Sequence, residues 1–189
     1  SIVSIFLLGW LIAAVGRAPH LPLWQFAPWH NWIPNVAMPF VCLLLAFGIA
    51  TPNPLSFATS NDEAFDPDHP GVVGVTRHPV LWAGALWAFA HAIPNGDLAH
   101  VLMFGVFGAF SILGMLAIDA RKRRVLGAAE WRRLARRTSL VPFAALADGG
   151  SRPALRKINL VRFSIAAALY VGFLTLHERV IGVSPFPPL

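Results

Sequence analysis

Residues 98–118 read LAHVLMFGVFGAFSILGMLAI and contain no Asp, Glu, Lys or Arg. A helix needs about 20 apolar residues to cross the hydrocarbon core of a bilayer, and this stretch reaches that length. The residues that follow, 119–124, read DARKRR. Such an abrupt change from apolar to cationic residues is typical of a membrane helix that ends at the lipid surface. The stretch therefore predicts a transmembrane helix.

Four more apolar stretches lie outside this one, at residues 1–16, 33–50, 79–94 and 158–176. Of the 189 residues, 56% are apolar and only 13% are charged, and the mean hydropathy is +0.61. Few soluble domains have this composition. We therefore expect an all-α fold in which residues 1–189 form a single transmembrane domain, a polytopic helical bundle of about five spans. Stretches 1–16 and 79–94 are short, so their helices are expected to tilt or to extend into their flanks.

The chain begins at Ser1 directly with an apolar run, without an initiator Met or a charged leader. A signal peptide would show a basic segment and a small-residue cleavage site, and neither is visible in this run. We interpret the sequence as a processed or truncated chain and expect an additional N-terminal helix upstream of Ser1.

Cations are concentrated in a loop at residues 120–157 and in the first turns of the span that follows. Lys and Arg in short loops remain on the cytoplasmic side, so we predict that this loop is cytoplasmic and that the protein lies in a bacterial inner membrane. Residues 51–77 should then share that side, whereas residues 17–32, residues 95–97 and the C-terminus should face the opposite side. Twelve of the 15 Lys and Arg residues belong to the basic segment: Arg121, Lys122, Arg123, Arg124, Arg132, Arg133, Arg136, Arg137, Arg152, Arg156, Lys157 and Arg162.

Part of the basic loop has the pattern of an amphipathic helix. Leu126, Trp131, Leu134 and Ala135 form an apolar stripe between cations, which predicts a helix on the membrane surface. Its Arg side chains are expected to bind the phosphates of membrane lipid, and binding of an anionic substrate or cofactor is the alternative. Nucleic acid is not expected as a partner, because the cations form one block beside the membrane and no separate soluble domain accompanies them.

His91 is the main candidate for chemistry, because an ionisable group within a membrane helix marks a functional site by default. Gly84 and Trp87 lie on the same helical face as His91. A small residue, an aromatic wall and an imidazole together offer a surface for a flat cofactor. The alternative is that His91 only forms a hydrogen bond with a neighbouring helix. A single imidazole is more typical of haem, whose second ligand comes from another helix.

Arg77, His78 and Pro79 stand at the cytoplasmic start of the 79–94 helix, where Pro is favoured at the first helical position. Arg77 is expected either to hold an anion with the help of the helix N-terminus or to anchor the helix at the lipid surface. At the other end of this helix, Asp97 is expected to cap the next one. The single cysteine, Cys42, is expected to act as a small apolar residue.

Several of these residues belong to short motifs whose order resembles the NnrU family over essentially the whole chain. The resemblance implies a polytopic helical membrane protein linked to nitrite and nitric-oxide reduction in denitrification. Plant zeta-carotene isomerases are relatives in this family, and they use haem b to move a polyene double bond between cis and trans. The motifs are residues 76–79 (TRHP), 86–91 (LWAFAH), 95–97 (NGD), 118–119 (ID) and 137–145 (RTSLVPFAA).

The resemblance also implies roles for single residues. His91 corresponds to the haem ligand, so it is the expected metal ligand and a catalytic residue. Trp87 belongs to the same family motif, and Trp87 and Gly84, which share the helical face of His91, are expected to contact the cofactor. Arg77 and His78 are the further catalytic candidates. The implied substrate is apolar, a polyene or nitric oxide, and the implied chemistry is isomerase-like or redox.

The second axial ligand of the haem does not follow from this sequence. In the family pattern it is a histidine on an earlier helix, which would precede Ser1, so a second helix is expected to supply it. His100 and His177 are local substitutes if the fold brings either one opposite His91. Ala88 stands where the plant pattern has a thiol, and its side chain cannot bind iron.

Two further classes of function remain open. Arg77, His78 and Pro79, followed by Glu130-Trp131 and by residues 137–142, also resemble small integral-membrane methyltransferases, which hold S-adenosylmethionine at the cytoplasmic edge. The third reading is a non-catalytic accessory or assembly subunit of a respiratory reductase, in which the same motifs serve helix packing.

Overall fold

The computed structural model describes residues 2–59, 61–147 and 159–187, and within these ranges the chain forms helices and no strand. The predicted all-α fold is confirmed. In chain order the elements are α1 (Ile2–Val15), η1 (Pro28–Asn31), α2 (Trp32–Gly48), η2 (Asp62–Ala64), α3 (Val72–Val75), α4 (Pro79–Ala92), α5 (Leu98–Leu126), α6 (Ala128–Ala135), α7 (Ala144–Ala147) and α8 (Leu160–Ile181).

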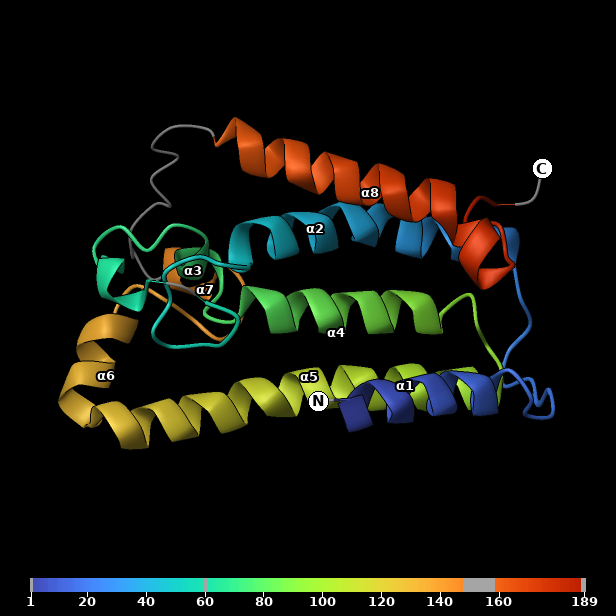
Figure 1. Cartoon of the computed structure of the whole chain (residues 1–189), viewed down its shortest axis with the longest axis horizontal. Coiled ribbons are helices and arrows are strands. Elements are labelled where there is room, and N and C mark those ends of the chain that lie inside the picture. The colour runs from blue at the N-terminus through green and yellow to red at the C-terminus, as the bar shows by residue number, and fades with distance from the viewer. Residues whose placement is uncertain (1, 60, 148–158, 188–189) are drawn as a thin grey trace.

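The long helices lie side by side in the order α8, α2, α4, α5 and α1 (Figure 1). α4 packs between α2 and α5, α8 contacts α2, and α1 contacts α5. Among the described residues, three helical segments are long and apolar enough to cross a membrane, namely residues 28–48, α5 and α8. The chain is therefore a helical membrane protein, as its composition predicted.

Two of the expected spans stay short. α1 and α4 have 14 residues each, which corresponds to about 21 Å of helix against a hydrocarbon core of about 30 Å. Among the described residues, neither helix extends beyond its apolar stretch, since α1 covers Ile2–Val15 and α4 covers Pro79–Ala92. The other expectation, that the two helices tilt, stays a prediction. At the start of α4, Pro79 occupies the first turn, as predicted.

α5 is longer than the sequence suggested. It has 29 residues and continues through the first cations of the basic segment to Leu126. The first residues of the predicted basic loop, which starts at residue 120, are therefore still helical. Ala, Arg, Lys and Leu are good helix formers even where they cannot enter lipid, so the helix continues until Gly127, whose φ of +78° ends it.

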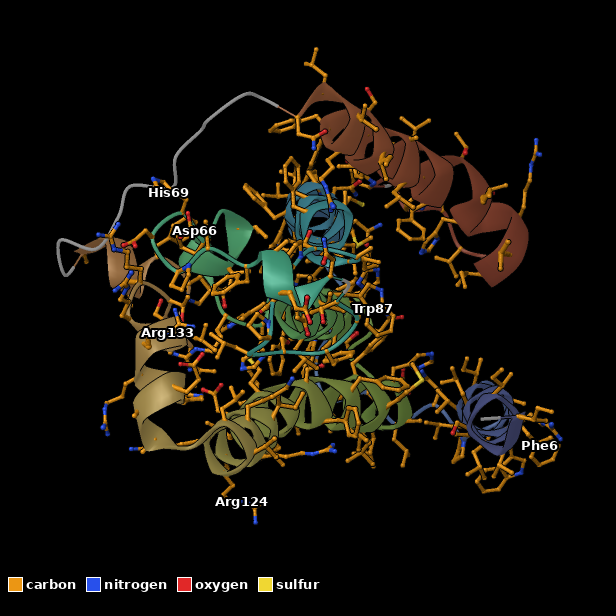
Figure 2. The ribbon with its side chains drawn as sticks, turned by 60° about the vertical axis from the view of Figure 1, so that its left-hand side comes forward. Phe6, Asp66, His69, Trp87, Arg124 and Arg133 are labelled. Carbon is orange, nitrogen blue, oxygen red and sulfur yellow. The ribbon has the colours of Figure 1, made fainter. Side chains whose placement is uncertain are left out.

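Small side chains on α4 allow its neighbours to approach closely. Ala85 and Ala88 are completely buried, and a Cβ placed on Gly48 of α2 would lie 2.8 Å from the Cγ atom of Pro79. α1 and α8 differ from α4, since of their described residues α8 buries Ala166 and α1 buries none. Phe6 of α1 points away from the other helices (Figure 2), which suits contact with lipid.

The two ends of the helices differ in character. At one end, the Leu23 N–H donates to the Gly96 carbonyl over 2.8 Å, and the Asn35 side chain donates to the Pro185 carbonyl over 2.7 Å. The loop before α2, the turn before α5 and the C-terminal segment thus meet there, as predicted. The other end carries α3, α6 and α7 (Figure 1), and the side chains of Arg124 and Arg133 project from it (Figure 2).

The predicted amphipathic helix is present as α6. Leu134 and Ala135 are buried on its inner face, where they pack with Leu55. On its outer face, Arg133 donates to Glu130 over 2.8 and 2.7 Å, and this hydrogen bonding lowers the pKa of the Glu130 carboxyl. Residues 148–157 of the predicted basic loop lie outside the described residues.

Candidate functional site

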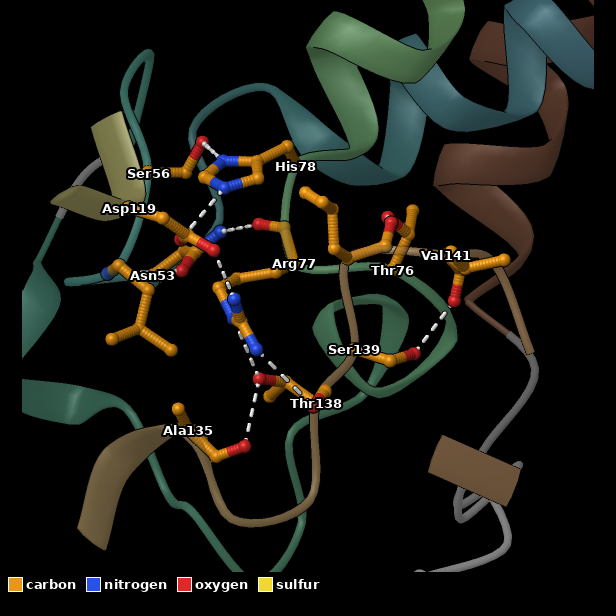
Figure 3. Close-up of polar contacts among 12 residues, drawn as sticks. Asn53, Ser56, Thr76, Arg77, His78, Asp119, Ala135, Thr138, Ser139 and Val141 are labelled. Carbon is orange, nitrogen blue, oxygen red and sulfur yellow. Dashed lines mark hydrogen bonds and ion pairs between the residues drawn. The ribbon is translucent and has the colours of Figure 1, made fainter. Parts of the chain in front are cut away.

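Buried polar side chains gather where the start of α4 meets the basic end of α5 (Figure 3). Five of the six are at most 7% exposed, and the Asp119 side chain is 18% exposed. Buried polar groups destabilise a fold unless they are hydrogen-bonded. We call this cluster the polar centre. It consists of Asn53, Ser56, Arg77, His78, Asp119 and Thr138.

Arg77 is occupied by partners within the protein. One terminal nitrogen forms an ion pair with Asp119, and Nε donates to the Thr138 hydroxyl over 3.0 Å. The guanidinium carbon also lies 4.9 Å from the centre of the Trp131 ring, and the guanidinium carbon of Arg123 lies 5.5 Å from the same centre. These contacts tie α4, α5 and α6 together. They support a positioning role for Arg77 more than the binding of an external anion.

His78 is completely buried and forms a hydrogen bond through each ring nitrogen. Nε2 lies 3.0 Å from an Asp119 oxygen, and Nδ1 lies 2.8 Å from the Ser56 hydroxyl oxygen. A carboxylate only accepts hydrogen bonds, so the ring N–H is on Nε2 and donates to Asp119. In the neutral ring, Nδ1 then carries the lone pair and accepts the hydrogen of Ser56.

Backbone bonds fix the segments that supply these side chains. The side-chain amide nitrogen of Asn53 donates to the Arg77 carbonyl over 2.9 Å, and the side-chain oxygen of Asn53 accepts the Leu55 N–H over 3.1 Å. The Arg77 N–H donates to the Ser139 carbonyl over 2.8 Å. The segments before α4, after α2 and after α6 are therefore held in one arrangement. Chemically, the polar centre can take a proton from Ser56 and hold the resulting imidazolium beside a carboxylate.

His91 lies near the other end of α4, away from the polar centre. Its Nδ1 donates to the Trp87 carbonyl over 2.8 Å, a bond within the same helix. Its ring centre lies 5.4 Å from that of Trp87 and 5.8 Å from that of Phe104 on α5. His91 therefore has an aromatic environment, and the ring nitrogen with the lone pair is Nε2.

Part of the helical face on which a flat cofactor was expected packs against α5. A Cβ on Gly84 would lie 2.9 Å from the Ser111 hydroxyl oxygen. The Trp87 ring packs against Phe104 and Phe107, with ring centres 5.4 and 5.9 Å apart. Gly84 and Trp87 thus contribute to helix packing while both stay partly exposed, and the expectation that they contact a cofactor stays a prediction.

His100 and His177 are the two local candidates for a second ligand. His100 forms an ion pair with Asp97, and Asp97 also accepts the Ala99 N–H over 3.2 Å, which confirms its predicted capping role. His177 of α8 donates from its Nδ1 to the Val183 carbonyl over 2.8 Å. In the described part of the chain, His, Cys, Asp and Glu side chains form no group of three or more that could hold a metal ion.

Sequence reasoning assigned no role to Asn53, Ser56, Asp119 or Thr138. Asp119 gave a usable signal, because it is a lone acid between an apolar helix and a run of cations. The other three are small polar residues in loops, and such residues are common in turns of any protein. Cys42 is completely buried against Ala46 and Ala166, in line with its predicted apolar role.

A series of apolar helices with a buried polar centre at one end defines this chain as a polytopic helical membrane protein. Its particular family follows from comparison with family models: the model of the NnrU family, described as NnrU protein, matches residues 1–185. The chain belongs to the NnrU family. No curated protein and no solved structure matches it.

Proposed function

We propose that the chain binds haem b through His91 and serves nitrite or nitric-oxide reduction from the bacterial inner membrane. The supporting observation is the hydrogen bond from His91 Nδ1 to the Trp87 carbonyl. Histidines that bind metals almost always donate their other ring N–H to a carbonyl or carboxylate, which fixes the tautomer and ring orientation. His91 is prepared in this way, and Nε2 is the nitrogen that would bind iron.

The surroundings of His91 suit an apolar ligand group. Phe104 and Trp87 flank the imidazole, and apolar walls around a haem limit water access and tune its potential. Haem would supply an iron that binds nitric oxide or acts on a polyene, and the protein would supply orientation and an apolar environment. α5 packs on part of Gly84 and Trp87, so the proposal depends on His91 more than on these two residues.

The second axial ligand is proposed to come from another helix. Both local candidates, His100 and His177, keep Nε2 for such a role, because Asp97 and the Val183 carbonyl engage their Nδ1 atoms.

An absorption spectrum of the purified full-length protein tests this proposal. Protein from haem-replete cells should show a Soret band that is lost in His91→Ala. His69→Ala is the matched control, because His69 is exposed and pairs with Asp66 at the opposite end of α4, and it should keep the band. Colourless wild-type protein, or a band that persists in His91→Ala, would contradict haem binding at His91.

The methyltransferase alternative requires Arg77 to be free for a cofactor. Arg77 is instead engaged by Asp119, Thr138 and Trp131, and this argues against it. Calorimetric titration with S-adenosylmethionine tests the alternative directly. The accessory alternative gains support if the protein binds neither ligand and copurifies with a respiratory reductase.

A further inference from the structure

Ser56, His78 and Asp119 form a linear chain of hydrogen bonds in the polar centre (Figure 3). We propose that Ser56 is an activated nucleophile that cleaves an ester of an anionic amphiphile, with His78 as its base and Asp119 as the group that orients the base. This proposal goes beyond haem binding and does not depend on it. The residues concerned lie at the opposite end of α4 from His91.

The protonation pattern of the chain carries the first step of the argument. Because Asp119 fixes the ring N–H of His78 on Nε2, the Nδ1 lone pair faces the Ser56 hydroxyl at 2.8 Å. A serine becomes nucleophilic when an oriented base accepts its proton in this way. The hydrogen-bonded chain of Ser56, His78 and Asp119 resembles a Ser-His-Asp triad, except that Nδ1 faces the serine and Nε2 faces the aspartate.

The orientation of the base is held from both sides. His78 has no exposed surface, and the second Asp119 oxygen is bound by Arg77. The imidazole therefore cannot turn away from Ser56 without breaking a buried bond. After proton transfer, the imidazolium would lie beside the Asp119 carboxylate, which stabilises that charge.

A cavity beside Ser56 indicates the class of substrate. Its volume is about 320 Å³, and its lining combines apolar with cationic side chains. It lies where the apolar part of α5 ends and the cations begin, which corresponds to headgroup depth in a membrane. Such a site suits an acyl ester whose polar end carries a negative charge. Besides Ser56, the lining residues are Phe57, Ile118, Arg121, Lys122 and Val125.

The reaction is a balanced ester hydrolysis. Ser56 Oγ transfers its proton to His78 Nδ1 and forms a bond to the ester carbonyl carbon. As the C–O bond to the alcohol breaks, the alcohol oxygen takes that proton from His78. Water then attacks the acyl-Ser56 ester through the same base, which releases a carboxylic acid and restores the Ser56 hydroxyl.

The test uses the intact wild-type chain in detergent and an alkyl fluorophosphonate, which reacts with activated serines. Peptide mapping by mass spectrometry should locate the adduct on Ser56 in folded protein, and heat-unfolded protein should not react. Ser56→Ala should lose the adduct. Ser139→Ala should keep it, because the Ser139 hydroxyl donates to the Val141 carbonyl outside the hydrogen-bonded chain of Ser56, His78 and Asp119.

The cationic lining is tested separately. In the double variant Arg121→Gln and Lys122→Gln, the rate of labelling by a fluorophosphonate with a terminal carboxylate should fall at least about tenfold. Labelling by the neutral alkyl probe should not change. If Ser56 in folded wild-type protein stays unlabelled, or the adduct maps to another serine, Ser56 is not an activated nucleophile. Equal effects on both probes would refute the anionic substrate class.

Discussion

Asp119 is the residue on which the polar centre depends. Its two carboxylate oxygens bind Arg77 and His78, and these partners are 7% and 0% exposed. Without the carboxylate, the Arg77 charge would remain in a site from which water is largely excluded. Removing one member of a buried ion pair is more damaging than losing a surface pair, because the remaining charge is left without compensation.

We therefore expect Asp119→Asn to lower the free energy of unfolding by about 3 kcal/mol. Thermal unfolding of the detergent-solubilised protein, followed by circular dichroism, measures this change. Asp66→Asn is the matched control. Asp66 also binds a histidine, because its carboxylate lies 2.7 Å from His69, and this hydrogen bond lowers the pKa of the Asp66 carboxyl. The Asp66 side chain, however, is 54% exposed. The control should unfold almost as the wild type does, and equal losses in both variants would contradict the assigned role of Asp119.

Local signals were enough to predict some roles but not the polar centre. The cap at Asp97 depends on residues two and three positions away, so its pattern is visible in the sequence. Arg77, in contrast, finds its partners 42 and 61 positions along the chain. Those contacts exist only because α4 packs against α5 and the segment after α6 folds back on α4. A pattern of neighbouring residues contains no such information.

The crossing of α2 and α4 depends on the absence of a side chain at Gly48. A Cβ there would lie 2.8 and 2.9 Å from two atoms of the Pro79 ring, and a proline ring cannot turn aside. We expect Gly48→Ala to force the helices apart and to cost about 1–3 kcal/mol of unfolding free energy. The change should appear as a lower unfolding temperature in detergent.

Gly105→Ala provides the control for this crossing. None of the described atoms outside its own helix would come within 4 Å of a Cβ at Gly105, and alanine favours a helix over glycine by about 0.5–1 kcal/mol. This variant should be as stable as the wild type or slightly more stable. If Gly105→Ala destabilises as much as Gly48→Ala, close packing at Gly48 is not the cause.

The type of each long helix was predictable, whereas its ends were not. Apolar stretches identified α2, α5 and α8 because lipid demands such stretches. The end of α5 depends on helix propensity and on the backbone of Gly127, which act independently of the lipid boundary. Arg162 shows a related effect: its guanidinium donates to the Ala46 and Ile49 carbonyls at the end of α2 over 2.6 and 3.1 Å. From the sequence, Arg162 was used only to predict the orientation of the chain in the membrane. In the structure it also caps the C-terminus of α2.

The long helices lie side by side, and the two ends of this bundle differ chemically. His91 lies near the end where the loop before α2, the turn before α5 and the C-terminal segment meet. The polar centre lies at the end with α6 and the described cations of the basic segment (Figure 1). The two proposed activities would therefore face different compartments, and a small apolar ligand could reach His91 without passing the cations.

Which end faces the cytoplasm can be measured with single cysteines. Val125 is 74% exposed at the basic end, and Val183 is 62% exposed at the other, whereas the native Cys42 is completely buried. Because Lys and Arg are retained on the cytoplasmic side, a membrane-impermeant maleimide should label Val183→Cys in spheroplasts and Val125→Cys only in inverted vesicles. The unmodified chain should remain unlabelled in both. The reverse pattern would place the basic end outside the cytoplasm, and lipid electrostatics could then no longer explain the orientation.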